Sequence, residues 1–172
     1  MKKGIIIALC SLAIAFVACK KPVEPTPVNY ADNYVGNYLG QFSFTITSLD
    51  NTPQTGFEVP PIDNIVMDIA KGSETNTITA TVTVDNKSYQ ASGTTTEEKA
   101  VISLNGLVID ETHQLLFPYY FDVDLLLEGT KAASDTLNID GTFSGSGRYT
   151  MAGVENPVEE VSGTVKGKLV KQ

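Results

Sequence analysis

From Tyr34 to the end of the chain, hydrophobic and polar residues alternate with a period of two. The first segment, YVGNYLGQFSFTI, places Tyr34, Tyr38 and Phe42 on one face and Asn37 and Gln41 on the other. This alternation is typical of a β-strand that is buried on one side only. The sequence therefore predicts eight strands, because seven further segments repeat the pattern: residues 63–70, 75–85, 87–95, 100–110, 114–129, 136–151 and 161–170.

The segments between these strands are short and rich in turn-forming residues. We expect a tight hairpin at Asp85-Asn86 and a loop over residues 50–61, which contain three prolines and a glycine. No segment after Cys19 shows the 3.6-residue period of a helix. Regularly spaced strands joined by short turns predict an all-β fold, either an antiparallel sandwich or an up-and-down barrel.

Glycines at inward positions favour the barrel. They concentrate in the first and the last two strands, which have to meet if the sheet closes. On the concave side of a coiled sheet, a glycine removes a side chain that would clash. We therefore predict a single antiparallel, up-and-down β-barrel of about eight strands, whose interior is filled by side chains or holds one small ligand. The glycines are Gly36, Gly40, Gly141, Gly145, Gly147, Gly163 and Gly167.

The chain begins with a different pattern, a predominantly apolar run from Gly4 to Ala18. This run is shorter than the roughly 20 residues that a membrane-spanning helix needs. Lys2 and Lys3 precede it, and the small residue Ala18 ends it, as in an export signal that is cleaved off. We expect residues 1–18 to be a signal peptide.

The residues FVAC at positions 16–19 resemble the lipobox of bacterial lipoproteins. The resemblance implies that Cys19 is lipidated, becomes the first residue of the mature chain and anchors it to a membrane. Lys20 stands where many inner-membrane lipoproteins have aspartate, so the resemblance implies the outer membrane, with the periplasmic and surface-facing sides both open. A plain secretory signal is the alternative, and it would leave Cys19 as an exposed free thiol.

Residues 19–29 carry three prolines and predict an extended, semi-rigid tether in front of a domain at residues 30–172. The chain has 20 acidic and 12 basic residues, a formal net charge of −8, which disfavours nucleic acid and anionic lipid surfaces as partners. Cys10 and Cys19 are its only cysteines, so we expect no disulfide and no thiolate metal cage in the domain.

The first strand opens with GNYLG, which contains Gly36, Tyr38 and Gly40. Together with eight strands and a lipobox, this motif resembles the calycin-like, lipocalin-related lipoproteins of gut-type Gram-negative anaerobes. The resemblance covers residues 30–172, and Tyr38 stands where lipocalins proper have a tryptophan. It implies a barrel able to bind a small molecule, and it implies no known reaction.

Residues that could carry catalysis or bind metal are few. His113, the only histidine, lies in the polar turn DETHQ, where one imidazole beside two acidic residues makes a poor metal site. Asp122 and Asp124 share the polar face of their strand, where both carboxylates would be solvated and equally acidic. A regular strand also splays oxygen ligands that would bind calcium. We expect no enzyme activity, no cofactor and no metal, since nucleophile-elbow and phosphate-loop motifs are absent too.

Arg148, the only arginine, has two interpretations. Lipocalins lay an arginine across the aromatic ring of the first strand, and a bulge at the neighbouring GSG would turn Arg148 inward to do this against Tyr38. Without a bulge, the alternation places Arg148 on the surface. The same alternation directs Tyr149 and Met151 into the barrel.

The inward aromatic residues are the remaining candidates for a binding site. They form only a core if bulky groups fill the interior. If the glycines leave a hollow, tyrosine hydroxyls supply its polar anchors, and the ligand enters where the first strand begins and meets the aromatic strand. An interaction module, such as an adhesin or accessory subunit that contacts a protein or glycan, is the alternative function. The ligand-binding residues would be Tyr34, Tyr38, Phe42, Tyr119, Phe121 and Tyr149.

Overall fold

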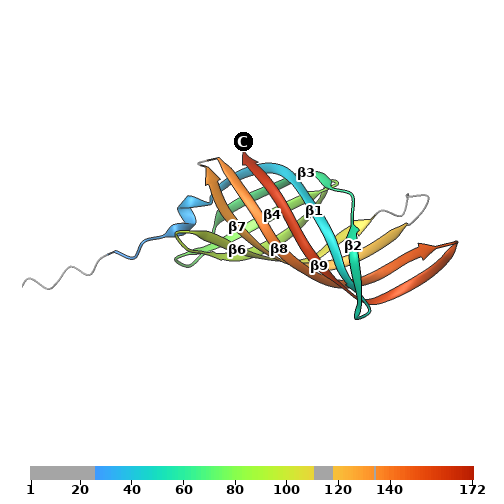
Figure 1. Cartoon of the computed structure of the whole chain (residues 1–172). Coiled ribbons are helices and arrows are strands. Elements are labelled where there is room, and N and C mark those ends of the chain that lie inside the picture. The colour runs from blue at the N-terminus through green and yellow to red at the C-terminus, as the bar shows by residue number, and fades with distance from the viewer. Residues whose placement is uncertain (1–25, 111–117, 134) are drawn as a thin grey trace, which may run out of the picture.

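The computed structural model describes residues 26–110, 118–133 and 135–172, with residues 56 and 57 described by their backbone alone. A short 3-10 helix, η1 (Tyr30–Asn33), precedes nine strands (Figure 1). The strands are β1 (Gly36–Leu49), β2 (Thr52–Glu58), β3 (Ile62–Lys71), β4 (Thr77–Val84), β5 (Lys87–Thr95), β6 (Lys99–Asp110), β7 (Tyr119–Ala133), β8 (Thr136–Met151) and β9 (Val154–Lys171). No helix in the described part of the chain is long and apolar enough to span a membrane.

The strands form a closed antiparallel barrel of eight strands with one extra strand, which confirms the predicted fold class. Each strand from β3 to β9 pairs with the next, and β1 pairs with both β3 and β9. The closing ladder runs from Tyr38↔Lys171 to Leu49↔Val161. Glycine permits the close approach of these two strands, because a Cβ at Gly40 would overlap the carbonyl oxygen of Lys168.

The extra strand is β2, and it lies within residues 50–61, so the prediction of a loop there was wrong. β2 pairs with the last part of β1, whereas β3 pairs with Gly36–Phe42 of the same strand. Pro60 and Pro61 stand between β2 and β3 and offer no backbone donor, so one barrel strand is divided into two. β9 likewise begins at Val154, earlier than predicted, because Pro157 and several glutamates hide the alternation there.

The inward residues form one continuous hydrophobic core. On β4, Ile78, Ala80 and Val82 are buried, as the alternation predicts. β6 shows why its face was unclear from the sequence: its pairing register with β7 shifts between Leu104 and Leu107. This bulge moves the inward positions by one residue. The expected hairpin at Asp85-Asn86 is confirmed, with both residues in the left-handed conformation.

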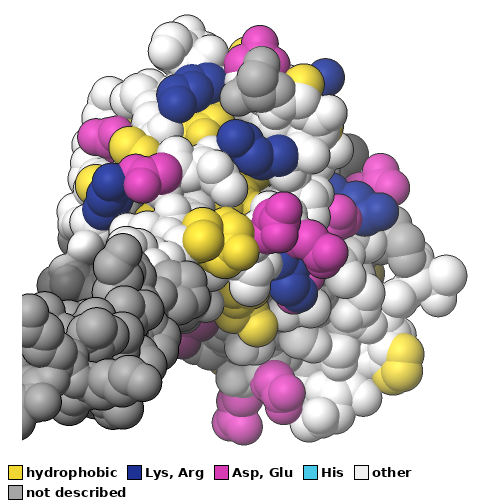
Figure 2. Space-filling view, turned by 90° about the vertical axis from the view of Figure 1, so that its left-hand side faces the viewer, with side chains coloured by type: hydrophobic (Ala, Val, Ile, Leu, Met, Phe, Trp, Pro, Cys, Tyr) yellow, Lys and Arg dark blue, Asp and Glu magenta, His cyan; other side chains and the backbone are white. Residues whose placement is uncertain are grey.

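Because β1 starts at one end of the barrel, we call that end the near end and the opposite end the far end. η1 covers the near end, where Asn29 accepts hydrogen bonds from the backbone N–H groups of Ala31 and Asn76, each at 3.1 Å. Lys71 and Asp32 form an ion pair there. Viewed from this side, lysines and acidic side chains are interspersed around small apolar areas (Figure 2).

The far end has a different shape. β8 and β9 run on as a hairpin that projects beyond the other strands (Figure 1). Met151, which the alternation directs inward, is 61% exposed at the tip of this hairpin, so its predicted burial was wrong. The alternation continues along β8, but the projecting tip has no opposite wall to pack against.

Candidate functional site

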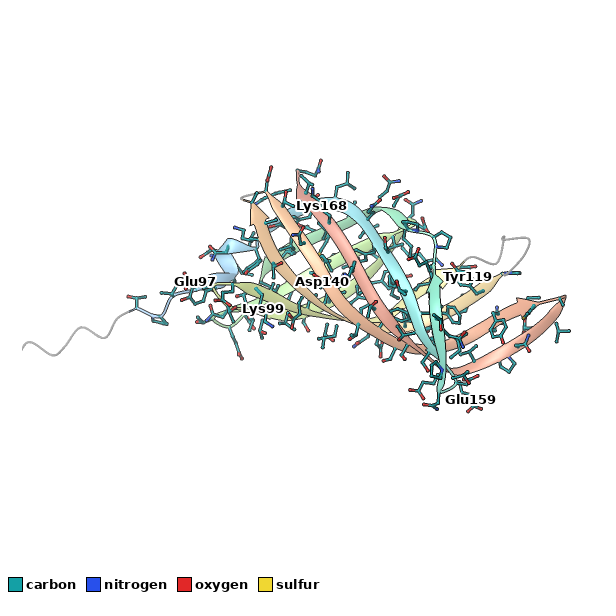
Figure 3. The ribbon with its side chains drawn as sticks, viewed as in Figure 1. Glu97, Lys99, Tyr119, Asp140, Glu159 and Lys168 are labelled. Atoms are coloured by element: carbon teal, nitrogen blue, oxygen red, sulfur yellow. The ribbon has the colours of Figure 1, made fainter. Side chains whose placement is uncertain are left out.

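The structure divides the six residues of the predicted ligand site into three groups. Tyr34 and Tyr38 lie at the near end, where β1 begins, and Phe42 lies further along β1. Tyr119, Phe121 and Tyr149 lie at the far end, where β7 begins and β8 approaches its end. The predicted entry site assumes that the beginning of β1 and Tyr119 of the aromatic strand meet at one end of the barrel, and this assumption was wrong. Those two strand beginnings are at opposite ends of the barrel, and Figure 3 shows Tyr119 away from Glu97 and Lys99 of the near end.

The near-end pair is part of the core. Tyr34 is the C-cap residue of η1 and has no exposed surface, and Tyr38 is only 2% exposed. The Tyr38 hydroxyl donates a hydrogen bond of 2.9 Å to the backbone carbonyl of Tyr34. Burial raises the pKa of both phenols, and the neighbouring Tyr38 and Glu98 raise the pKa of Tyr34 further. Both hydroxyls therefore stay protonated and neutral in a closed, apolar end.

Phe42 belongs to a cluster in the middle of the barrel. Its ring contacts Phe44 edge-on at 6.4 Å between centroids, and Phe44 contacts Phe143 edge-on at 5.6 Å. All three side chains are buried. This cluster joins β1 and β8 over Gly163 of β9, the strand between them.

The far half of the interior is aromatic as well. Tyr119 and Phe121 stack at 5.4 Å between ring centroids, and Tyr119 lies directly opposite Tyr149 in the β7–β8 ladder. On the other side, Phe121 lies opposite Ile109 of β6. Tyr149 is half-buried, so its ring lies at the border between the apolar interior and solvent.

The wall of the barrel is incompletely paired beside this aromatic half. β5 pairs with β6 only from Ala91↔Leu104 to Thr95↔Ala100. β5 starts four residues before Ala91, and β6 continues past Leu104 to Asp110. The part of β5 before Ala91 and the part of β6 after Leu104 do not pair with each other. The cause is the β6 bulge, where Gly106 has a φ of 69° and its N–H donates to Asp124 Oδ1 at 2.8 Å. We call this unpaired part of the wall the β5–β6 gap.

Two inward residues of β5 mark the gap. Ala91 is 7% exposed, more than any other residue of the buried core. Tyr89 is half-buried and packs against the core. The sequence analysis did not include either residue in the site. The Asn105-Gly106 pair in the middle of a predicted strand is the signal that could have located the gap, because such residues often mark a bulge.

Other candidate residues lie outside the barrel interior. Arg148 stacks on the ring of Tyr120 at 4.9 Å and pairs with Glu155 at 3.5 Å, so the surface interpretation is confirmed and the alternative contact with Tyr38 is not formed. Arg148 and Tyr120 are direct neighbours in the β7–β8 ladder on the outer face. Asp122 also faces outward and is exposed.

Within the described ranges, no three histidine, cysteine or acidic residues are grouped so that they could hold a metal ion. His113 and Cys19 lie outside the described residues. No family model matches the chain, and a search of curated proteins finds no similar sequence either.

Proposed function

We propose that this protein is a non-enzymatic, lipid-anchored protein of the bacterial outer membrane that holds a small apolar or amphipathic molecule in the far half of its barrel. Cys19 provides the anchor, and the FVAC motif supports this part of the proposal. The barrel fold is compatible with ligand binding. The ligand enters through the β5–β6 gap.

The incomplete pairing of β5 with β6 is the observation that carries the proposal. A backbone hydrogen bond contributes about 1 kcal/mol net, so opening a fully paired wall over several residues would cost several kcal/mol. The part of β5 before Ala91 can move away from β6 without breaking any hydrogen bond of the ladder between these two strands. Ligand entry at this place is therefore energetically easier than through a paired part of the wall.

The chemistry behind the gap suits an amphipathic ligand. Ile109, Phe121 and Tyr119 offer apolar contact, while Tyr89 and Tyr149 are half-buried and carry hydroxyls at the border of the interior. Pockets for small molecules combine a mostly apolar lining with a few polar groups in this way. Tyrosine suits such a border because its ring is apolar and its hydroxyl is polar.

A titration with 1-anilinonaphthalene-8-sulfonate, which joins apolar rings to a sulfonate, tests the proposal. Residues 20–172 are used, since they contain every described strand. Ala91→Phe fills the interior at the gap, and Ala100→Phe is the matched control: it also enlarges a buried alanine, but at the near-end limit of the same ladder. Both variants should lose about 1–3 kcal/mol of stability through overpacking.

We expect saturable binding by the unmodified chain, binding at least ten times weaker by Ala91→Phe, and little change for Ala100→Phe. Urea unfolding confirms that each variant is folded at the temperature of the titration. Absence of saturable binding by the unmodified chain contradicts the proposed function. Equal loss in both variants contradicts entry through the β5–β6 gap.

A further inference from the structure

A hollow of about 640 Å³ lies on the outer face of the barrel where β1 is flanked by β9 and β3. Leu39 and Gln41 of β1 lie between Val170 and Lys168 of β9 on one side and Asn64 of β3 on the other. In the ladder, Leu39 is directly opposite Val170, and Gln41 is directly opposite Lys168. All five side chains are exposed. Figure 3 shows Lys168 on the outside of this wall.

A second hollow, of about 290 Å³, continues along the same strands. There Ser43 and Thr45 of β1 lie between Lys166 of β9 and Glu58 of β2. Since Leu39 and Thr45 are six residues apart on one strand, the two hollows together extend over about 20 Å. We call them the outer furrow.

The outer furrow arises where the neighbour of β1 changes from β3 to β2. Opposite this change, the register of β1 with β3 shifts between Gly40 and Phe42, and Asn64 adopts a left-handed φ of 57°. Pro61 also lines the second hollow. The bulge and the break between β2 and β3 lie side by side, so no regular strand continues alongside β1 at this point and its outer face is left in a hollow. Bulges of this kind are common next to binding sites.

Five polar side chains of the outer furrow have no hydrogen-bond or ion-pair partner among the described residues. This holds for the Gln41 amide of β1 and for the Lys168 ammonium group on the β9 side. It also holds for the Asn64 amide and for the carboxylates of Asp63 and Glu58 on the side of β3 and β2. Hydrogen-bond donors and acceptors therefore line both sides of the outer furrow.

The outer furrow also has an apolar end. Leu39 and Val170 are each 37% exposed and face the solvent side by side. A ligand that suits the whole furrow has hydroxyl or similar groups along its edges and C–H groups on its faces. A sugar ring has this combination, and several linked rings fill a furrow of this length.

We propose that the outer furrow binds an oligosaccharide. Amide, carboxylate and ammonium groups hydrogen-bond its hydroxyls, and Leu39 with Val170 packs against the C–H face of one ring. This site is on the outside of the wall and is independent of the proposed ligand in the barrel interior.

An extended peptide suits the outer furrow less well. Peptides that add to a sheet pair with the backbone of a free strand edge. β1 has no such edge here, because it pairs with β9 from Tyr38 to Leu49 and with β3 and β2 on its other side. Recognition in the furrow therefore depends on side chains, and the side chains present are those that bind hydroxyl groups.

A glycan microarray that presents linear neutral and acidic oligosaccharides tests the proposal with the full-length protein in mild detergent. Gln41→Trp blocks the middle of the outer furrow. Ser92→Trp is the matched control, since Ser92 is also exposed, outward-facing and in the middle of a strand, on β5. Tryptophan suits strand positions, so both variants should fold. The chain has no tryptophan of its own, so the fluorescence of the introduced indole reports binding directly.

We expect the unmodified protein and Ser92→Trp to bind the same oligosaccharides and Gln41→Trp to bind them at least ten times more weakly. For oligosaccharides that still bind, the indole of Gln41→Trp should change its emission, and that of Ser92→Trp should not. Absence of binding to every oligosaccharide on the array overturns the proposal. So does equal binding by Gln41→Trp and Ser92→Trp, because the sugar would then lie elsewhere.

Discussion

Replacing Tyr34 by phenylalanine is expected to stabilise the barrel, although Tyr34 is part of the native core. Its side chain has no exposed surface, and its hydroxyl has no hydrogen-bond partner among the described residues. Burying a hydroxyl without a partner costs about 1–3 kcal/mol by mutational measurements. Tyr34→Phe removes this cost and keeps the ring in place. We therefore expect the free energy of unfolding to rise by about 1 kcal/mol or more.

Tyr38→Phe should have the opposite effect. The Tyr38 hydroxyl donates the 2.9 Å hydrogen bond to the backbone carbonyl of Tyr34. A typical hydrogen bond contributes about 0.5–1.5 kcal/mol net, and its loss also leaves a buried carbonyl without this donor. We expect Tyr38→Phe to lower the free energy of unfolding by about 1–2 kcal/mol. Two tyrosines four residues apart thus respond to the same substitution with opposite signs.

Urea unfolding followed by circular dichroism measures both changes. The slope of free energy against urea should stay constant, so that a shift of the midpoint reports stability alone. For a domain of this size, 1 kcal/mol corresponds to about 2–4 °C in Tm. Tyr120→Phe on the outer face is the control and should change stability by less than about 0.5 kcal/mol. If Tyr34→Phe destabilises the barrel, its hydroxyl has a partner, such as a buried water, and the reasoning is refuted.

Three further predictions concern pH, the anchor and the closure of the barrel. Burial raises the pKa of Tyr34 and Tyr38, so the free energy of unfolding should be fully retained below the ordinary tyrosine pKa of about 10 and fall above it. The fall should be up to about 1.4 kcal/mol per group and pH unit. Urea unfolding between about pH 9 and 11 measures this change, and a flat profile would contradict it. Cys19→Ala should release the protein from membranes, and the intact mass of the unmodified protein should lack residues 1–18 and include acyl chains; an unmodified mass would contradict lipidation. Gly40→Ala should cost about 3 kcal/mol or more in urea unfolding, since its Cβ overlaps the Lys168 carbonyl oxygen, whereas mild destabilisation would show that β1 and β9 can separate.

The sequence predicts which residues of each strand face inward better than it predicts how far each strand pairs with the strands beside it. A period of two is enough to predict that Tyr38, Phe121 and Val165 face inward, because a register shift of one residue would expose the whole hydrophobic face of a strand. Closure of the sheet was predictable as well, since Gly40 and Gly163 occur in the two strands that meet. Both inferences depend only on local alternation and residue size.

The candidate site was less predictable because it depends on how far each strand pairs. Alternation does not show that β5 pairs with β6 only from Ala91 onward, or that Asn64 leaves the regular ladder of β3. Each of these features follows from a bulge, which changes register without changing composition. Tyr34 and Tyr119 were grouped for the same reason: both face inward, and only the direction of their strands separates them by the length of the barrel.

Native mass spectrometry of the protein purified from its natural host tests the central claim most directly. The account predicts that the unmodified protein retains a small molecule of defined mass, and that Ala91→Phe, expressed in the same host, is free of it while Ala100→Phe retains it. A protein that carries no small molecule in any of the three forms would contradict a ligand in the barrel. Retention by Ala91→Phe would contradict its place behind the β5–β6 gap.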